Sequence, residues 1–290
     1  MTTPARQPPL VTVAISCYNH QDYIEAAIES VLRQTYTPIE LLVLDDGSRD
    51  GSVPRIRQLA DKYGFFFETQ KNMGLSATLN KALGMAKGEY YVPFGSDDIM
   101  MLDRLEKQVA HMEENRDLSI CAGNILKIDA AGNILPNRQK FHPAATLDFY
   151  DVFLERKSKG PAPTLFFRTD AIRKAGGFNP EIRLEDVYIQ LSMTHQGHKI
   201  GFLNDVLAYY RTHPTNTNKD IDFMYRNLLK TYECFRDDSH YPAVRARFLN
   251  SMLVKASKKN KSLAREILSS IPLRDYKLKT LRGAFKTLFG

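Results

Sequence analysis

The sequence predicts an α/β fold: a mostly parallel sheet flanked by helices, then a mixed half, then a helical C-terminal region. Two observations predict the sheet. Short apolar runs rich in β-branched residues recur along the first third of the chain, and stretches with helical spacing lie between them. Such alternation is typical of parallel sheets, because two parallel strands must be joined by a crossover, usually a helix.

The first half of the sheet is expected from four strands with three helices between them. The strands cover Leu10–Ser16, Ile39–Leu44, Phe65–Glu68 and Tyr90–Phe94. The helices cover Asp22–Gln34, the stretch from Val53 to Ala60, and Leu75–Lys87. The first two strands are apolar nearly throughout, which is expected of strands buried on both faces.

The second half of the sheet is expected to be mixed. Its predicted elements are a helix over Asp103–Asn115, a strand over Leu118–Ile128, a hairpin turn at Asp129–Asn133, a strand over Thr164–Arg168, a helix over Val187–Gln196 and a strand over Val206–Tyr210. From Ile221 onward the chain is expected to be helical. The sequence therefore predicts one domain over residues 1–220, with halves of about 10–100 and 101–220, and a separate region over 221–290.

Composition and short motifs argue against several classes of protein and of nucleotide-binding site. The chain has 290 residues, 43% of them hydrophobic, enough for one large domain and a smaller region. No apolar run approaches the roughly 18 residues that span a bilayer, and the opening MTTPARQPP lacks a signal-peptide core. Three distant cysteines form no disulfide or metal pattern, so a cytoplasmic location is expected. No GxGxxG or GxxxxGK[ST] is present, which argues against a dinucleotide or P-loop site.

The positive charge is concentrated at the C-terminal end. Residues 241–290 hold twelve Lys or Arg and two acids, a balance of +10, which leaves 28 basic and 31 acidic residues, or −3, for residues 1–240. Within 274–289, one helical face gathers Leu278, Leu281, Phe285, Leu288 and Phe289 among basic residues. This pattern predicts association with an anionic membrane surface. The alternative is a helix that packs its apolar face onto the domain. Nucleic-acid binding is not expected, because no fold for it accompanies the charge.

Polar residues follow each of the four predicted strands. In open parallel sheets the ligand crevice lies beyond the carboxyl ends of the strands, so these residues are expected to meet. They are Ser16, Tyr18, Asn19, Asp45, Asp46, Asn72, Ser96, Asp97 and Asp98. Taken singly, several have a structural interpretation, such as turn or helix-cap chemistry. Together they suit a base, a ribose, a diphosphate and a divalent metal.

The ordered series of motifs resembles the family 2 glycosyltransferases, inverting enzymes of GT-A fold that use nucleotide-diphospho-sugars. The matching pieces are VTVAISCYNHQDYIEAAIESVLRQTY, IELLVLDDGSRDGS, NMGLSATLNKALGMAKGEYYVPFGSDD, then GGF at Gly176–Phe178, Glu185-Asp186 and YRTH at Tyr210–His213. The resemblance covers roughly residues 10–215, about three quarters of the chain. The series is specific, although each piece alone is weak.

The resemblance implies a role for each matching residue. Ser16 and Tyr18 match positions that hold the nucleotide, Asn19 lies beside them, Asp46 matches the contact to uracil with Asp45 next to it, and Asn72 lines the donor side. Ser96-Asp97-Asp98 takes the place of the DxD motif, with Ser at its first position, which implies Asp98 as metal ligand and Asp97 toward the ribose or donor sugar. Asp186, preceded by Glu185, matches the catalytic base, and His213 matches a position that reaches the metal or diphosphate.

The implied activity is sugar transfer with inversion, from a nucleotide-sugar donor to a glycan or polyprenyl-linked saccharide of bacterial surface polysaccharide. The implied cofactor is Mg²⁺ or Mn²⁺. Asp46 favours a UDP-sugar, with dTDP or GDP donors left open. Alternatives are a noncatalytic nucleotide-sugar-binding protein and a nucleotidyltransferase. Without the family pattern, Glu185-Asp186 would be interpreted as helix N-terminal acids and His213 as a surface loop histidine. The acceptor is expected to contact roughly residues 125–185, and the enzyme to lie in the cytoplasm or at the inner face of the cell membrane.

Overall fold

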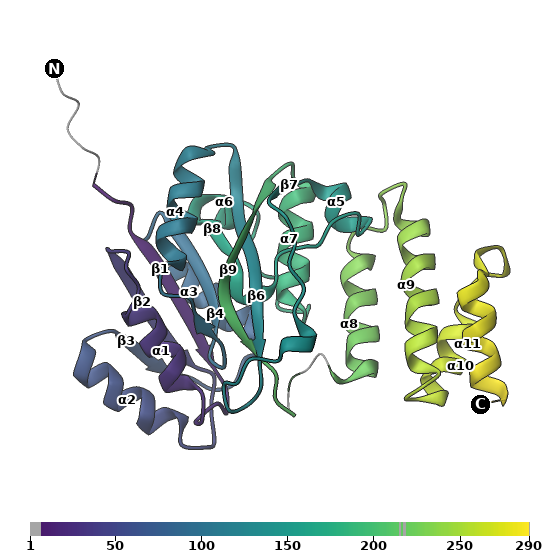
Figure 1. Ribbon diagram of the computed structural model, residues 1–290, viewed down its shortest axis with the longest axis horizontal. Helices are drawn as coiled ribbons and strands as arrows, with labels where there is room; N and C mark the ends of the chain where they lie inside the picture. The colour runs from purple at the N-terminus through teal and green to yellow at the C-terminus, as the bar shows by residue number, and fades with distance from the viewer. Residues whose placement is uncertain (1–6, 215, 217–218, 290) are drawn as a thin grey trace. The chain divides into compact units, whose positions relative to one another are not determined.

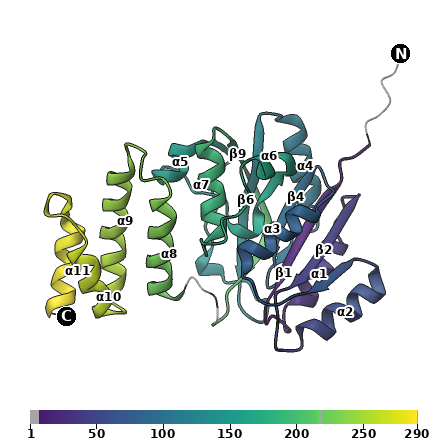
Figure 2. The same cartoon turned by 180° about the vertical axis from the view of Figure 1, so that it is seen from behind.

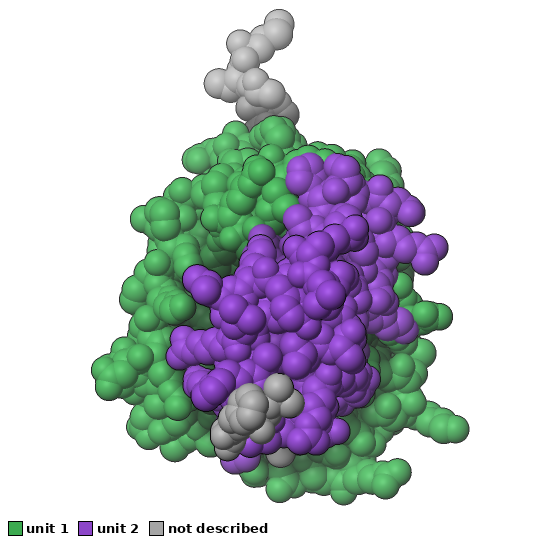
Figure 3. All heavy atoms as spheres, turned by 90° about the vertical axis from the view of Figure 1, so that its right-hand side faces the viewer, with its two compact units in different colours: residues 1–212 green, residues 213–290 purple. Residues whose placement is uncertain are grey.

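The computed structural model describes residues 7–214, 216 and 219–289, apart from the side chains of Leu288 and Phe289. The chain divides into two compact units (Figure 3). Unit 1 covers Met1–Thr212 and unit 2 covers His213–Gly290, so the division falls eight residues before the expected boundary at residue 220.

Unit 1 begins with four parallel strands. They are β1 (Val11–Cys17), β2 (Ile39–Asp45), β3 (Phe66–Thr69) and β4 (Tyr90–Gly95), in the spatial order β3-β2-β1-β4. The intervening helices are α1 (Ile24–Leu32), α2 (Ser52–Tyr63) and α3 (Leu75–Met85). Because the chain steps outward from β1 to β3 and then returns to β4 on the other side of β1, right-handed crossovers place α1 and α2 on one face and α3 on the other. Figures 1 and 2 show this arrangement from the front and from behind.

The core of unit 1 explains why these segments fold as they do. Val13, Ile15 and Val43 are fully buried in the central strands and pack with Ile28 of α1 and Ile56 of α2. Burying a side chain of this size contributes about 1.5–3 kcal/mol, so the apolar runs commit β1 and β2 to the middle of the sheet. The carboxyl ends of the parallel strands therefore meet at one edge, as the sequence predicted.

The second half of unit 1 is mixed, as predicted. Strand β8 (Phe166–Arg168) lies antiparallel between β4 and β6 (Leu118–Ile128), and β9 (Lys199–Arg211) runs parallel to β6. Strands β5 (Ile99–Met100) and β7 (Ala145–Leu147) pair antiparallel with β9 and complete the nine-stranded sheet of the described residues. The helices of this half are α4 (Arg104–Glu114), α5 (Phe149–Phe153), α6 (Thr169–Lys174) and α7 (Glu185–His195).

Several short elements differ from the expectation. The sequence predicted neither β5, β7, α5 nor α6, and it placed the start of β9 at Val206 instead of Lys199. The first part of β9 contains Gly201 and Asn204, which have low strand propensity. Packing overrides propensity here: a Cβ on Gly201 would lie 2.5 Å from Leu118 Cδ1, so the glycine permits the close approach.

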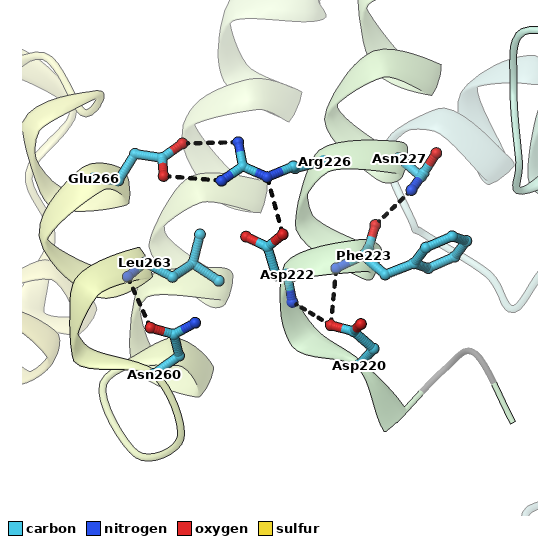
Figure 4. A network of polar contacts seen from close by, with 8 residues as sticks. All are labelled: Asp220, Asp222, Phe223, Arg226, Asn227, Asn260, Leu263 and Glu266. Atoms are coloured by element: carbon cyan, nitrogen blue, oxygen red, sulfur yellow. Dashed lines mark hydrogen bonds and ion pairs between the residues drawn. The ribbon is translucent and has the colours of Figure 1, made fainter. Parts of the chain in front are cut away.

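Unit 2 is helical, as predicted for the C-terminal region. Its helices are α8 (Ile221–Glu233), α9 (Tyr241–Ala256), α10 (Lys261–Ser269) and α11 (Leu278–Phe289), and α9 contacts each of the other three. Arg226 of α8 pairs with Asp222 at 3.0 Å and with Glu266 of α10 at 3.1 Å (Figure 4). Among the described residues, no helix is both long enough and apolar enough to span a bilayer.

Helix α11 packs within unit 2 through its small side chains. Thr280, Gly283 and Thr287 are buried, and a Cβ on Gly283 would lie 2.6 Å from Leu253 Cγ of α9. The large apolar side chains lie on the other side of the helix. Leu278, Leu281 and Phe285 are 86%, 59% and 65% exposed, while the side chains of Leu288 and Phe289 fall outside the described part of the chain. Within unit 2 the large apolar side chains of α11 that the structure describes are therefore exposed.

Candidate functional site

The loops after β1 and β2 are tied together at the carboxyl edge. The backbone N–H of Asn19 donates to Ser48 Oγ at 2.9 Å, and the N–H of Arg49 donates to Asn19 Oδ1 at 2.8 Å. Asn19 has a φ of 56°, in the left-handed region that asparagine tolerates better than most residues. Tyr18 is 47% exposed at this edge, and Ser16 lies just below it in β1, between Leu44 of β2 and Gly95 of β4.

Asp45 and Asp46 hold the turn after β2 and the loop after β3. Asp45 Oδ1 accepts from the N–H groups of Gly47 at 3.1 Å and Ser48 at 2.9 Å, and its buried Oδ2 has no hydrogen-bond partner among the described residues. Asp46 accepts at 2.9 Å from Gln70 Nε2 and from the N–H groups of Met73 and Gly74.

These contacts fix the shape of the donor side of the edge. Gly47 has a φ of 82°, and a Cβ there would lie 2.9 Å from the Asn72 backbone nitrogen, so only glycine lets the two loops approach. Asn72 itself is exposed. Gln70 was not among the predicted site residues, although its amide group reaches Asp46 directly. The structure thus gives both aspartates a positioning role in addition to any contact with a ligand.

The two acids after β4 have different surroundings. Asp98 is buried, and its Oδ1 accepts from the backbone N–H of Arg211 at 2.8 Å. Arg211 Nε also donates to the Asp97 carbonyl at 2.8 Å, which joins the end of β9 to this turn. Burial and the charge of Asp97 raise the pKa of Asp98 well above its usual range. Asp97 is more exposed than Asp98, so the two carboxylates are not equivalent.

His20 belongs to this edge, although it was not predicted as a site residue. Its Nδ1 lies 2.7 Å from Ser96 Oγ, and a ring nitrogen lies within 4.8 Å of an Asp97 carboxylate oxygen. The only available signal in the sequence was its position, directly after Asn19 at the end of the first strand. An imidazole nitrogen beside carboxylate oxygens is a donor set that fits a divalent metal ion.

Glu185 and Asp186 form the first turn of α7. Gln190 holds this turn: its Nε2 donates to the Asp186 carbonyl at 2.8 Å and to the Gly160 carbonyl at 3.0 Å. Burial raises the pKa of both acids. The charge of Asp186 raises the pKa of Glu185 further, whereas Lys159 opposes the rise at Asp186. The pair therefore titrates as a unit, at higher pH than isolated carboxyl groups.

Tyr210 links the two acidic clusters. Burial raises the pKa of its hydroxyl, and the charges of Asp98, Asp97 and Asp186 raise it further, so all three acids act on one phenol. The turn after β4 and the start of α7 therefore both lie near the end of β9. His213, three residues beyond Tyr210, is the first residue of unit 2, and its role as a metal ligand stays a prediction.

Comparison with known proteins gives the family. The sequence profile of "Glycosyl transferase family 2" matches residues 12–174, more than half of the chain. The chain belongs to this family. The match includes the loops after β1, β2 and β4, whereas α7 and unit 2 lie beyond it. The predicted family is therefore confirmed, and the chain is a glycosyltransferase.

One relative and two solved structures illustrate the similarity. The putative teichuronic acid biosynthesis glycosyltransferase TuaG of Bacillus subtilis is 31% identical over 70% of this chain and 79% of its own length. The S. aureus TarS 1–349 complex with UDP-GlcNAc has a TM-score of 0.70 at 18% identity, covering 96% of this chain and 88% of that one. The mannosyltransferase PcManGT of Pyrobaculum calidifontis, in complex with GDP-Man and Mn²⁺, has a TM-score of 0.65 at 19% identity, covering 98% and 88%.

The two solved structures are below 25% identity and confirm the GT-A fold alone. Among the curated relatives, the matches span from 21% to 79% of the relative's own length. TuaG is named for teichuronic acid biosynthesis, and another relative, AmsE of Erwinia amylovora, for amylovoran biosynthesis.

Proposed function

We propose that this family 2 glycosyltransferase moves one sugar, with inversion, from a nucleotide-diphosphate donor to a glycan or polyprenyl-linked saccharide of bacterial surface polysaccharide. The observation that carries the proposal is that Asp97, Asp98 and Asp186 all lie near enough to Tyr210, at the end of β9, for their charges to raise the pKa of its hydroxyl. These acids would provide the two groups that the reaction needs: ligands for a diphosphate-bound cation, and a separate carboxylate for the acceptor's proton. The name of TuaG and the UDP-GlcNAc complex of TarS support the substrate class.

The donor nucleotide is assigned to the edge formed by the loops after β1, β2 and β3. The exposed ring of Tyr18 offers a face for stacking on a base. Asp46 accepts from the N–H of Met73 and so holds the loop carrying Asn72 against the turn after β2, and the buried Asp45 Oδ2 retains acceptor capacity for an N–H or O–H donor. A UDP-sugar is the favoured donor.

A divalent cation would be held by the acids after β4. The family resemblance implied direct contact for Asp98, but Asp98 Oδ1 already accepts the Arg211 N–H, and Asp97 is the acid beside the His20 nitrogen. We therefore assign direct contact first to Asp97, with Asp98 buried beneath it and supporting the turn. When bound, the cation would stabilise the charge that develops on the leaving nucleoside diphosphate.

Asp186 is assigned as the base that takes the proton of the acceptor hydroxyl. A general base works best when its pKa lies near the working pH, and burial raises the pKa of Asp186 in that direction. The charge of Asp186 in turn raises the pKa of Glu185 beside it. Attack opposite to the leaving group then inverts the anomeric centre.

A panel of nucleotide-sugars tests this proposal. Full-length protein with Mg²⁺ or Mn²⁺ is expected to hydrolyse one UDP-sugar slowly and to be stabilised against heat by it. Metal-dependent stabilisation without hydrolysis or transfer, across UDP-, dTDP- and GDP-sugars, would support the noncatalytic binding protein instead. No stabilisation by any of them would remove the donor assignment.

We also propose that residues 274–289 bring the enzyme to an anionic membrane, where a polyprenyl-linked acceptor would lie. The observation in favour is the exposed apolar side of α11, with Leu278, Leu281 and Phe285 flanked by basic residues. An apolar stripe with a basic border matches the interfacial layer of anionic lipids. The enzyme would then work at the inner face of the cell membrane.

A further inference from the structure

We propose that His20 supplies a nitrogen ligand to the divalent ion of the donor site, so that the site prefers a transition-metal ion such as Mn²⁺ over Mg²⁺. The inference rests on the proposed function, because the ion is taken to arrive with the donor's diphosphate. It adds a residue to which neither the family resemblance nor the Ser96-Asp97-Asp98 assignment gave a role.

The backbone of His20 is fixed by two helices. Its carbonyl accepts from the N–H groups of Tyr23 at 3.0 Å and Ile24 at 2.9 Å, at the start of α1. Its own N–H donates to Ser52 Oγ at 3.1 Å, at the start of α2. The imidazole is therefore carried by a well-anchored loop, as a metal ligand requires.

Ser96 orients the ring. His20 Nδ1 lies 2.7 Å from Ser96 Oγ, and in the tautomer with the proton on Nδ1, that nitrogen donates to the hydroxyl. Nε2 then carries the lone pair that a metal ion accepts. Histidine ligands commonly donate their second ring N–H to an oxygen in this way, which fixes both tautomer and orientation.

The turn after β4 leaves little room for a further carboxylate at the position before Ser96. A Cβ on Gly95 would lie 3.0 Å from Asp97 Oδ1 and 3.0 Å from Asp98 Oδ2, so both carboxylates would have to shift by a few tenths of an ångström to admit a side chain. The ring from the β1 loop reaches the same turn from the neighbouring strand, within 4.8 Å of Asp97. The Ser96-Asp97-Asp98 motif alone would leave the ion held mainly by its substrate. His20 would supply a second protein ligand in addition to Asp97.

The donor set predicts metal preference. Mg²⁺ takes oxygen ligands almost exclusively and keeps several waters. Imidazole nitrogen is instead a ligand of transition-metal ions, and Mn²⁺ is the transition-metal ion that also suits the oxygen ligands of Mg²⁺ sites. A site that combines Asp97 with His20 is therefore expected to bind Mn²⁺ more tightly than Mg²⁺ in the presence of a nucleoside diphosphate.

Electron spin-echo modulation of bound Mn²⁺ tests the ligand directly. Full-length protein with UDP and Mn²⁺ is expected to show ¹⁴N coupling, and His20→Gln is expected to reduce it. Calorimetry in the presence of UDP should show that His20→Gln lowers the affinity for Mn²⁺ by about 10-fold or more and leaves the affinity for Mg²⁺ nearly unchanged. Ser96→Ala should also lower the affinity for Mn²⁺ by at least about 10-fold, because residues that hydrogen-bond to metal ligands have effects of that size. His142→Gln, in another loop of unit 1, is the matched control and should change neither measurement.

The outcomes separate this inference from the proposed function. Unchanged ¹⁴N coupling in His20→Gln overturns it, whether or not His213→Gln removes the coupling. Equal losses of Mn²⁺ and Mg²⁺ affinity in His20→Gln also overturn it, because a nitrogen ligand must discriminate between the ions. Retained donor hydrolysis with either of these results leaves the glycosyltransferase assignment intact. If His20→Gln fails to fold, as judged by thermal unfolding, Ser96→Ala with the same readouts decides.

Discussion

The carboxyl edge of unit 1 and the α11 surface of unit 2 are built in opposite ways. At the edge, short hydrogen bonds hold the side chains of the proposed site: Asp46 by three donors, Asp98 by Arg211, and His20 by Ser96. On α11, the exposed side chains of Leu281 and Phe285 project from a helix that is anchored by its other face. Catalysis requires that the reacting groups be held in fixed positions. Binding to a lipid surface requires only exposed apolar area and positive charge. The two regions should therefore respond differently to substitution.

The largest effect is expected from Asp186→Asn. The carboxamide cannot accept the acceptor's proton, so sugar transfer should fall by about 10²–10⁴-fold, the usual contribution of a positioned base. Donor binding, measured by calorimetry with the UDP-sugar found in the nucleotide-sugar panel, should stay within about twofold. Asp61→Asn, which changes an exposed acid of α2, is the control and should transfer normally. Turnover by Asp186→Asn at the wild-type rate would remove the base assignment.

A smaller effect is expected when the α11 surface is made polar. Leu281→Gln with Phe285→Gln removes two exposed apolar side chains, each of which contributes up to about 1.5–3 kcal/mol when it leaves water. Partitioning onto vesicles of anionic phospholipid, measured by co-sedimentation, should fall by at least about 10-fold, while donor hydrolysis in solution should not change.

A matched control for the membrane surface lies in unit 1. Leu102 is 59% exposed, the same fraction as Leu281, but lies outside the basic region. Leu102→Gln should bind the vesicles like the wild type. Equal vesicle binding by the double variant and the wild type would show that α11 does not contact the membrane.

The sequence predicted the carboxyl edge and the α11 surface to different extents. The edge follows from strand positions, because parallel strands that end in polar residues bring those residues together. Asp186 lies instead at the start of a helix and was predicted from the family resemblance, and its charge, like those of Asp97 and Asp98, raises the pKa of Tyr210. The partners of these residues were not predictable. His20 reaches Ser96 from a loop 76 positions away, and no local pattern carries a contact of that separation.

For α11, periodicity gave the apolar stripe, but it could not decide which face would be buried. The buried face consists of Thr280, Gly283 and Thr287, because a small residue lets the α9 backbone approach where leucine would not fit. The fit between two helices depends on both surfaces, and a single helical pattern contains only one of them. The alternative of an apolar face packed onto the domain arose from this gap.

Two helical glycines, one in each unit, test how closely α11 packs on α9. On helix propensity alone, Gly283→Ala should stabilise α11 by up to about 1 kcal/mol. The added Cβ would instead lie 2.6 Å from Leu253 Cγ, so we expect unit 2 to be destabilised by about 1–3 kcal/mol. Hydrogen exchange of the α11 and α9 amides measures the change.

Gly84, near the end of α3, is the matched control for this pair. Nothing lies within 4 Å of a Cβ added there, so Gly84→Ala should follow propensity and slow amide exchange in α3. Faster exchange in α11 for Gly283→Ala together with slower exchange in α3 for Gly84→Ala is the expected result. Slower exchange in α11 would mean that Leu253 moves aside and that the close packing of α11 on α9 is not required.

The smallest effect is expected from the charge beside the base. Lys159 holds down the pKa of Asp186, so Lys159→Met should raise that pKa further. Because only the deprotonated acid accepts a proton, the acidic limb of the profile of kcat/KM against pH should move to higher pH. The shift should be less than about one pH unit, because solvent near the two groups weakens their interaction. The plateau at high pH should not change, since the base is then ionised in both proteins.

Lys157→Met is the matched control for this shift. Lys157 lies in the same loop but is paired with Asp151 at 2.9 Å, so its charge is already balanced. Its substitution should leave the acidic limb in place. An equal displacement in both variants would mean that the general positive potential of the loop acts on the site, and no displacement in Lys159→Met would mean that the titrating group is not Asp186. A shift confined to Lys159→Met would instead tie the measured limb to one carboxylate at the start of α7, which the loss of activity in Asp186→Asn alone cannot do.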